Sequence, residues 1–263
     1  MKMEQSNKST LSMGRRFITA FVLSCLLLAP VLSNAQDKIK NIVLVHGAFA
    51  DGSGWKGVFE ILTKKGYHVT AVQIPLTSLK DDVDATTRIL DKQDGPVILV
   101  GHSWGGVVIT EAGMHPKVAG LVYVAAYQPD KGENTLQWAA TAPTLPEYGI
   151  LPPDENGFVY YDKAKFHGGF AGDLSQAETD FMFASQEPIF GGSFETAVAD
   201  AAWRTKPAYG IVATEDKSIN PEIERNMYKR SNTHTTEIKG SHVIFISHPD
   251  AVAKVIIAAA EKK

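Results

Sequence analysis

The chain has 263 residues, of which 44% are hydrophobic, and its formal net charge at pH 7 is −3. This length and apolar content suit one α/β domain with a modest insertion. The sequence has no basic stripe for nucleic acid, no Cys/His cluster with metal-ligand spacing and no Gly-x-Gly-x-x-Gly after a strand, so we expect no nucleic-acid partner, metal or other cofactor.

The first 35 residues have the pattern of a secretory signal peptide. A basic segment at Gly14-Arg15-Arg16 precedes an apolar run from Phe17 to Leu32, and Ser33-Asn34-Ala35 forms a small-residue cleavage site. The run contains Pro30 and is short for a bilayer span of about 20 residues, which argues against a membrane anchor. We therefore expect export to the periplasm or medium, with no membrane association after cleavage.

Two alternatives concern the same segment. Met13 could be the true start, because residues 1–12 are polar and are not needed for a signal peptide. Val22-Leu23-Ser24-Cys25 is an imperfect lipoprotein signal, although apolar residues continue beyond it. Cleavage after Ala35 would remove Cys25, the only cysteine, and would leave a mature chain without a disulfide.

The first predicted strand of the mature chain is Asn41–Val45. Its continuous β-branched apolar run is typical of a strand buried on both faces of a parallel sheet. The loop that follows, His46-Gly47-Ala48-Phe49, can offer a backbone N–H to a developing oxyanion. We assign this donor to Ala48, with Phe49 as the alternative donor and as a substrate-binding side chain. A plain glycine-containing strand exit is the competing interpretation.

Strand and helix patterns alternate after this loop. The spacing predicts a helix over Trp55–Lys65 ended by Gly66, a strand over His68–Ile74 and a helix over Leu79–Lys92. A further strand is predicted over Val118–Ala126. This alternation indicates a doubly wound, mostly parallel α/β sheet, and the chain has room for about six strands.

The most informative motif lies between the predicted strand Pro96–Val100 and a helix that begins near Val107. It is Gly101-His102-Ser103-Trp104-Gly105, the Gly-x-Ser-x-Gly pattern of a nucleophile elbow, in which a tight turn strains and exposes the serine. We expect crowding at this turn to require both glycines. Because the turn opens a helix, the Trp104 N–H is predicted to be the second oxyanion donor and Ser103 the nucleophile. The pentapeptide alone also occurs in ordinary glycine-rich turns.

Residues 128–206 depart from the alternation and are rich in aromatic side chains. By position this segment should fold as a lid over Ser103. Most of its rings are expected to form the lid's own core, while Tyr161, Phe166 and Phe181 are predicted to line an apolar acyl or alcohol pocket, with His167 as a further candidate. The predicted divisions are thus the signal peptide (1–35), the core (36–127 and 207–263) and the lid (128–206).

A candidate acid follows the predicted strand Ala208–Ala213. The strand runs into Glu215 and Asp216, and a carboxylate at the end of a strand can fix the tautomer of a histidine and stabilise its imidazolium. Because the two residues are adjacent, their side chains should point in different directions. We favour Asp216 and keep Glu215 as the alternative.

A candidate base follows the last predicted strand, Thr235–Lys239. His242 lies in the loop after it, where the base of a Ser…Asp…His triad belongs. Of the other histidines, His102 is expected to face away from the nucleophile and His46 to support the oxyanion loop. His68, His115 and His234 flank strands or helices at positions typical of the surface, and His248 lies at a predicted helix start as a cap.

Together these segments resemble the α/β-hydrolase superfamily. The resemblance is carried, in order, by Leu44–Ala48 with Gly54-Trp55, by Val100–Gly106, by Ala213–Lys217 and by Ile238–His242, within the span Lys40–Lys263. Within the superfamily the chain is similar to the compact branch that contains plant methylesterases, hydroxynitrile lyases and many bacterial esterase-like proteins. The resemblance supports Asp216 over Glu215 and Ala48 over Phe49.

The resemblance implies a cofactor-free serine hydrolase that cleaves small carboxylic esters through an acyl-enzyme. Hydroxynitrile lyases of this branch carry a threonine and a lysine where this chain has Gly47 and Val243, which argues against a lyase. A haloperoxidase-type perhydrolase and a non-catalytic protein that binds a small ligand on the same fold are the alternatives. The sequence leaves the oligomeric state open, a homodimer included.

Overall fold

The fold is built on a parallel sheet of six strands in the order β2-β1-β3-β4-β7-β8. The computed structural model describes residues 38–261, so the predicted signal peptide and its cleavage site lie outside the described residues. The strands are β1 (Asn41–Val45), β2 (His68–Val72), β3 (Val97–Ser103), β4 (Val118–Ala126), β7 (Ala208–Ala213) and β8 (His234–Ile238). Every neighbouring pair in the sheet is parallel, which confirms the predicted α/β sheet of about six strands.

Burial along the strands follows their place in the sheet. The inner strands β1, β3 and β7 are buried at every residue, as continuous apolar runs covered on both faces should be. The edge strands β2 and β8 are largely exposed or half-buried. The inner strands therefore supply most of the sheet's contribution to the hydrophobic core.

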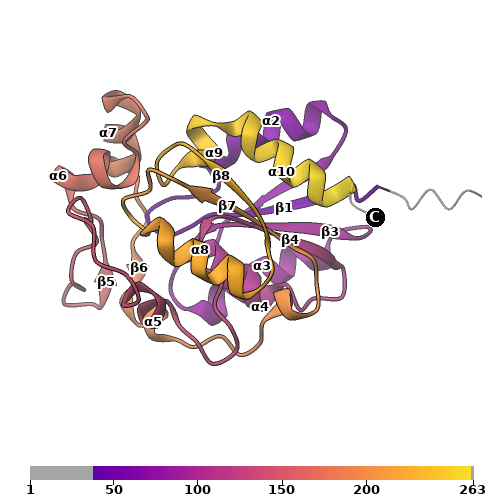
Figure 1. The fold of residues 1–263 in the computed structure, drawn as a ribbon, viewed down its shortest axis with the longest axis horizontal. Coiled ribbons are helices and arrows are strands. Elements are labelled where there is room, and N and C mark those ends of the chain that lie inside the picture. The colour runs from indigo at the N-terminus through magenta and orange to yellow at the C-terminus, as the bar shows by residue number, and fades with distance from the viewer. Residues whose placement is uncertain (1–37, 262–263) are drawn as a thin grey trace, which may run out of the picture. The chain divides into compact units, whose positions relative to one another are not determined.

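Helices cover both faces of the sheet (Figure 1). One face carries α2 (Lys56–Lys64), α9 (Ile244–Ser247) and α10 (Pro249–Glu261), and the other carries α3 (Leu79–Asp91), α4 (Trp104–Ala112) and α8 (Pro221–Arg230). Local sequence explains several helix ends. The Ser78 side chain accepts from the Asp81 N–H at the start of α3, and Gly66 follows α2 with φ of 81°.

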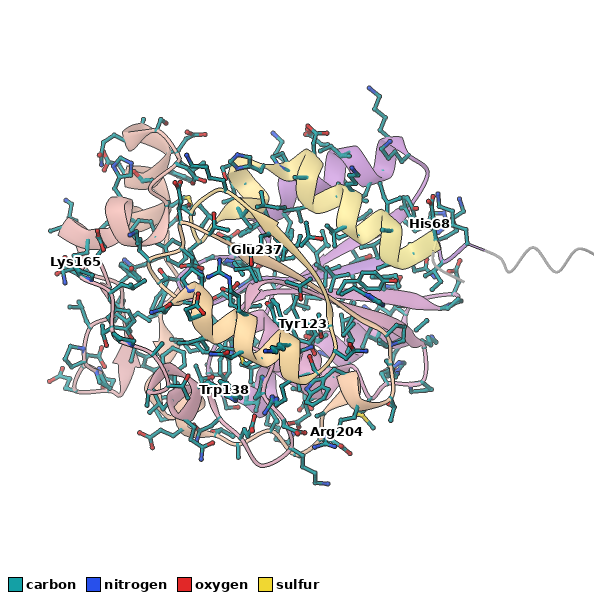
Figure 2. All side chains as sticks on the ribbon, viewed as in Figure 1. His68, Tyr123, Trp138, Lys165, Arg204 and Glu237 are labelled. Carbon is teal, nitrogen blue, oxygen red and sulfur yellow. The ribbon has the colours of Figure 1, made fainter. Side chains whose placement is uncertain are left out.

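The core fills the space between these layers. Figure 2 shows Tyr123 of β4 in the interior, and this side chain is fully buried with its hydroxyl 3.1 Å from that of Thr110. Lys165 lies at the outer margin of the same view. The Tyr123 hydroxyl is therefore a buried polar group with a hydrogen-bond partner, as most such groups in protein interiors are.

Most of the lid, residues 128–206, gathers at one end of the sheet (Figure 1), and its last residues run back beside α4. Its α-helices are α5 (Thr135–Ala139), α6 (Lys163–Lys165) and α7 (Gln176–Ala184). Its strands β5 (Phe158–Val159) and β6 (Ile189–Phe190) form an antiparallel pair. Three short helical turns complete it, η2 (Phe166–Phe170), η3 (Gly191–Glu195) and η4 (Ala202–Arg204). Capping boxes begin α5 at Asn134 and α7 at Ser175. Local capping signals therefore define the starts of these two lid helices.

Candidate active site

Ser103 stands at a sharp turn between β3 and α4. Its φ of 52° and ψ of −118° place it in a backbone region that residues other than glycine rarely adopt. Such a conformation costs about 1–3 kcal/mol and persists only where the surroundings enforce it. The turn leaves Ser103 at the carboxyl end of its strand, as the elbow motif predicts.

The two glycines of the motif are required by close backbone contacts. A Cβ atom at Gly105 would lie 2.7 Å from the carbonyl oxygens of Val45 and His46, and one at Gly101 would lie 2.4 Å from the carbonyl oxygen of Gly105. These distances are too short for a side chain, so the crowding comes from the backbone of the elbow and of β1. The motif therefore packs the elbow directly against the strand that carries the oxyanion loop.

Ser103, His242 and Asp216 form a continuous chain of hydrogen bonds. The Nδ1–H of His242 donates to Oδ2 of Asp216 at 2.6 Å, and the Ser103 hydroxyl donates to Nε2 of His242 at 2.9 Å. Asp216 and His242 are each 1% exposed. Because the carboxylate accepts the Nδ1 proton, the lone pair on Nε2 faces the serine hydroxyl, which is the arrangement needed to remove its proton.

The two adjacent acids point in different directions, as predicted. The free oxygen of Asp216, Oδ1, accepts from the backbone N–H groups of Ser218 at 2.7 Å and Ile219 at 2.9 Å. The Glu215 carboxylate is exposed and lies 3.5 Å from the Lys239 ammonium. The structure therefore brings Asp216 to His242 and leaves the alternative, Glu215, on the surface.

The predicted oxyanion donors surround Ser103 from two sides. Trp104 begins α4, so its N–H is among those that a helix cannot satisfy internally. Ala48 lies in the loop after β1, and a Cβ atom at neighbouring Gly47 would lie 2.7 Å from Cβ of Ser103. The alternative donor, Phe49, is excluded because its N–H donates to the Glu187 carbonyl at 3.1 Å.

Two buried histidines support this machinery. Nδ1–H of His46 donates to the Gly47 carbonyl at 2.9 Å and its Nε2 accepts from the Ile74 N–H at 3.1 Å. His102 donates from Nε2 to the His242 carbonyl at 3.0 Å, and its ring packs against the His242 ring with centroids 4.7 Å apart. Burial lowers the pKa of both histidines, so each stays neutral and neither competes with His242 as base.

Asp82 is a supporting residue that the sequence did not reveal. Its carboxylate, fully buried on α3, accepts from the Trp104 indole N–H and from the Leu76 N–H, both at 2.7 Å. Burial raises the pKa of Asp82 to about 6, although the hydrogen bond from Trp104 opposes this shift. Asp82 thus fixes the side chain of the residue whose backbone N–H is the predicted oxyanion donor.

A pH dependence of stability follows for Asp82. Because its pKa rises from 3.8 to about 6 on folding, the folded state binds more protons between these values and stability falls as the pH rises through them. Asp82→Asn is neutral throughout. We expect the free energy of unfolding of wild type, relative to Asp82→Asn, to fall by about 2 kcal/mol from pH 4 to pH 7. Urea unfolding at both pH values measures this, and parallel profiles would contradict it.

A cavity of about 520 Å³, measured with its mouth, opens at Ser103 and His242. From the core it is lined by Ala48, Phe49, Trp104, Tyr127, Ser218 and Ile219, and from the lid by Thr135, Leu136, Ala139, Tyr148, Ile150, Tyr161, Phe170 and Phe194. The lid therefore contributes half of the residues that line the cavity. The lining, largely apolar with a few polar groups, is typical of a site for a small molecule.

The predicted pocket residues divide into two groups. Phe49 and Tyr161 line the cavity, as expected. The predictions for Phe166 and Phe181 are wrong: Phe166 is buried behind Tyr161, with ring centroids 5.5 Å apart, and Phe181 is 73% exposed beside a separate hollow. His167, the further candidate, does not line the cavity. Its Nδ1 atom lies 2.8 Å from Oε1 of Gln176.

Within residues 38–261, no cluster of three or more His, Cys, Asp or Glu side chains is arranged to hold a metal ion. In the same part of the chain, no helix has the length and apolar character needed to cross a membrane.

Comparison with known proteins assigns the family. The model of the alpha/beta hydrolase family matches residues 42–255. A pyrethroid hydrolase of Sphingobium wenxiniae is 26% identical to this chain, and the alignment covers 83% of this chain and 86% of that protein. A putative chloroplastic methylesterase 11 of Arabidopsis thaliana is also 26% identical, and the alignment covers 82% of this chain and 63% of that protein. The crystal structure of a pyrethroid hydrolase from Sphingobium faniae has a TM-score of 0.73 at 24% identity, covering 84% of this chain and 97% of that one. The chain therefore belongs to the alpha/beta hydrolase family.

Proposed function

We propose that this protein is a serine hydrolase that cleaves small carboxylic esters. The observation that carries the proposal is the hydrogen-bonded series Asp216–His242–Ser103, with distances of 2.6 and 2.9 Å, ending at a strained elbow. Relatives named as a hydrolase and a methylesterase support ester cleavage. The apolar cavity beside Ser103 suits an uncharged ester better than a charged substrate.

In the proposed mechanism Oγ of Ser103 attacks the ester carbonyl while His242 takes the hydroxyl proton. Asp216 holds the imidazole and stabilises the imidazolium that forms. The N–H groups of Ala48 and Trp104 stabilise the oxyanion, each by roughly 3 kcal/mol. His242 then protonates the leaving alcohol, and a water molecule, activated by the same histidine, hydrolyses the acyl-enzyme and frees Ser103.

Turnover of p-nitrophenyl esters tests the proposal directly. The purified protein is expected to hydrolyse short acyl esters with saturation kinetics and without added metal or cofactor. Tight binding of such esters without product would contradict the proposal and favour a ligand-binding role. The structure offers no feature that favours perhydrolysis over hydrolysis.

Tyr148 is expected to limit the length of the substrate. Together with Tyr127, Ala139 and Ser218 it lines both the cavity and an adjoining hollow of about 430 Å³. Tyr148→Ala should join the two spaces and raise kcat/KM for a decanoate ester relative to a butyrate ester by about tenfold, the effect of burying about two more methylenes at roughly 0.8 kcal/mol each.

The matched control is Tyr160→Ala, because Tyr160 is 40% exposed and lies outside the cavity lining. The kcat/KM ratio of the two esters is measured for both variants. An unchanged ratio in Tyr148→Ala, or an equal change in Tyr160→Ala, would show that this wall does not set substrate length.

We also propose that the protein is exported. The support is the basic, apolar and small-residue pattern that ends at Ala35. Sequencing of the mature protein should find Gln36 at its N-terminus. Retention of the segment in exported protein would contradict the predicted cleavage.

A further inference from the structure

Asp173 of the lid bonds to the segment that carries His242. Its Oδ2 accepts from the Ser241 backbone N–H and from the Ser247 hydroxyl, both at 2.8 Å, and its Oδ1 accepts from the Ser241 hydroxyl. Ser241 directly precedes His242 and is 7% exposed. The carboxylate therefore fixes the backbone at the residue next to the proposed base.

The surroundings are shaped to admit this carboxylate. A Cβ atom at Gly240 would lie 3.0 Å from Oδ2 of Asp173 and 2.2 Å from Cδ1 of Ile244, so glycine leaves the space that the carboxylate uses. Burial alone would raise the pKa of Asp173, but the hydrogen bonds from Ser241 and Ser247 outweigh it and lower the pKa. Asp173 is therefore an ionised acceptor at neutral pH, and such hydrogen bonds are stronger than neutral ones.

The same short stretch of the lid also contacts the His242 ring and the loop that carries Asp216. The Phe170 ring packs against the His242 ring, with centroids 5.1 Å apart. The Gly169 carbonyl accepts from the Ser218 hydroxyl at 2.9 Å, and Ser218 in turn donates its N–H to Asp216. Residues 169–173 therefore contact the loop of the acid, the loop of the base and the ring of the base.

We propose that Asp173 is a positioning residue that makes the placement of His242 depend on the lid. Its hydrogen bonds fix the backbone of Ser241. Nε2 of His242 therefore stays within 2.9 Å of the Ser103 hydroxyl only while the lid packs against the segment that carries His242. A displacement of about 1 Å in such a group can lower the rate about 100-fold. This inference rests on the proposed function and assigns the lid a part in catalysis beyond lining the cavity.

The test compares Asp173→Ala with the matched control Ser247→Ala in the full-length protein. Asp173→Ala removes the carboxylate with all its hydrogen bonds. Ser247→Ala removes only the bond from the Ser247 hydroxyl and leaves the bonds between Asp173 and Ser241 in place. With kcat expressed per active site titrated by a fluorophosphonate, Asp173→Ala should lower kcat at least about tenfold with KM within about twofold, and Ser247→Ala should change kcat less than about threefold. Asp173→Asn should restore most of the rate, because its amide oxygen can take the place of Oδ2 and accept from the Ser241 N–H.

A second readout does not depend on turnover. The proton between His242 and Asp216 should give a downfield ¹H NMR resonance that shifts or broadens in Asp173→Ala and is unchanged in Ser247→Ala. Wild type without ester turnover would contradict the proposed function, while this resonance would still decide the role of Asp173.

A wild-type kcat per active site together with an unaltered resonance in Asp173→Ala would overturn the inference. An equal loss of kcat in Asp173→Ala and Ser247→Ala would also overturn it. Should Asp173→Ala fail to fold, Ser241→Ala, which removes one donor and leaves the lid intact, decides the question. It should lower kcat at least about threefold and shift the same resonance. No effect on either quantity would overturn the inference.

Discussion

Ser103→Ala is expected to lower kcat for ester hydrolysis by about 10⁵- to 10⁶-fold, the scale found when a triad nucleophile is removed. The substitution removes the hydroxyl that His242 holds at 2.9 Å and keeps the Cβ atom, so the strained turn and the cavity stay intact. Binding of substrate and product should therefore change little.

The measurement is single-turnover and steady-state kinetics with a p-nitrophenyl ester, together with the dissociation constant of the product acid. The expected pattern is a large loss in kcat with a dissociation constant within about threefold of wild type. Residual hydrolysis close to that of wild type would place the nucleophile elsewhere.

Asp216→Asn is expected to lower kcat by about 10⁴-fold, because an amide group facing Nδ1 of His242 favours the wrong imidazole tautomer. The carboxylate now accepts the Nδ1 proton at 2.6 Å, whereas an amide N–H cannot accept it. The amide oxygen can still accept from the N–H groups of Ser218 and Ile219, so the loop should keep its shape.

Glu215→Gln is the matched control for this substitution. Its carboxylate is 53% exposed and faces Lys239, so the change should alter kcat by less than about twofold. Steady-state kinetics on the two variants at one pH measure the contrast. Equal losses, or a larger loss in Glu215→Gln, would contradict the assignment of Asp216 as the acid.

The inner strands could be predicted from the sequence because each is an apolar run buried on both faces. Val118–Ala126 and Ala208–Ala213 match β4 and β7 at both ends. The edge strands were less well defined. β2 ends at Val72 rather than Ile74, because the Ile74 N–H bonds to the side chain of His46 instead of a strand. β8 begins and ends one residue earlier than predicted. Its residues are mostly exposed, so the alternation of apolar and polar residues that defines a half-buried strand is weak there.

The members of the proposed triad could also be predicted, and for a topological reason. Ser103 ends β3, while Asp216 and His242 follow β7 and β8, and parallel strands bring their carboxyl ends to one edge of the sheet. One ordered motif at each strand end was therefore enough to place residues that lie more than a hundred positions apart.

The lid side chains could not be predicted in the same way. No strand or helix period orients the rings of Phe166 and Phe181, so composition favoured them as pocket residues without fixing where they point. In the structure Phe166 packs into the lid's own core against Tyr161, Phe170 and Phe183, and Phe181 projects outward from α7.

The supporting roles of Asp82, Asp173 and His102 could not be predicted from the sequence, because their partners are distant along the chain. The bonds of Asp82, Asp173 and His102 to the site span 22, 68 and 140 residues. An aspartate in the first turn of α3 has an ordinary explanation as a favourable helix-dipole residue, which hides its bond to Trp104. Only tertiary packing identifies these three side chains as part of the site.

The assignment of Ser103 as an activated nucleophile is tested most directly by covalent labelling. The purified protein is incubated with a fluorophosphonate probe, and the adduct is located by peptide mass spectrometry. A single adduct on Ser103, abolished in Ser103→Ala and strongly slowed in Asp216→Asn, is the predicted result. No adduct, or an adduct on another residue, would contradict the account.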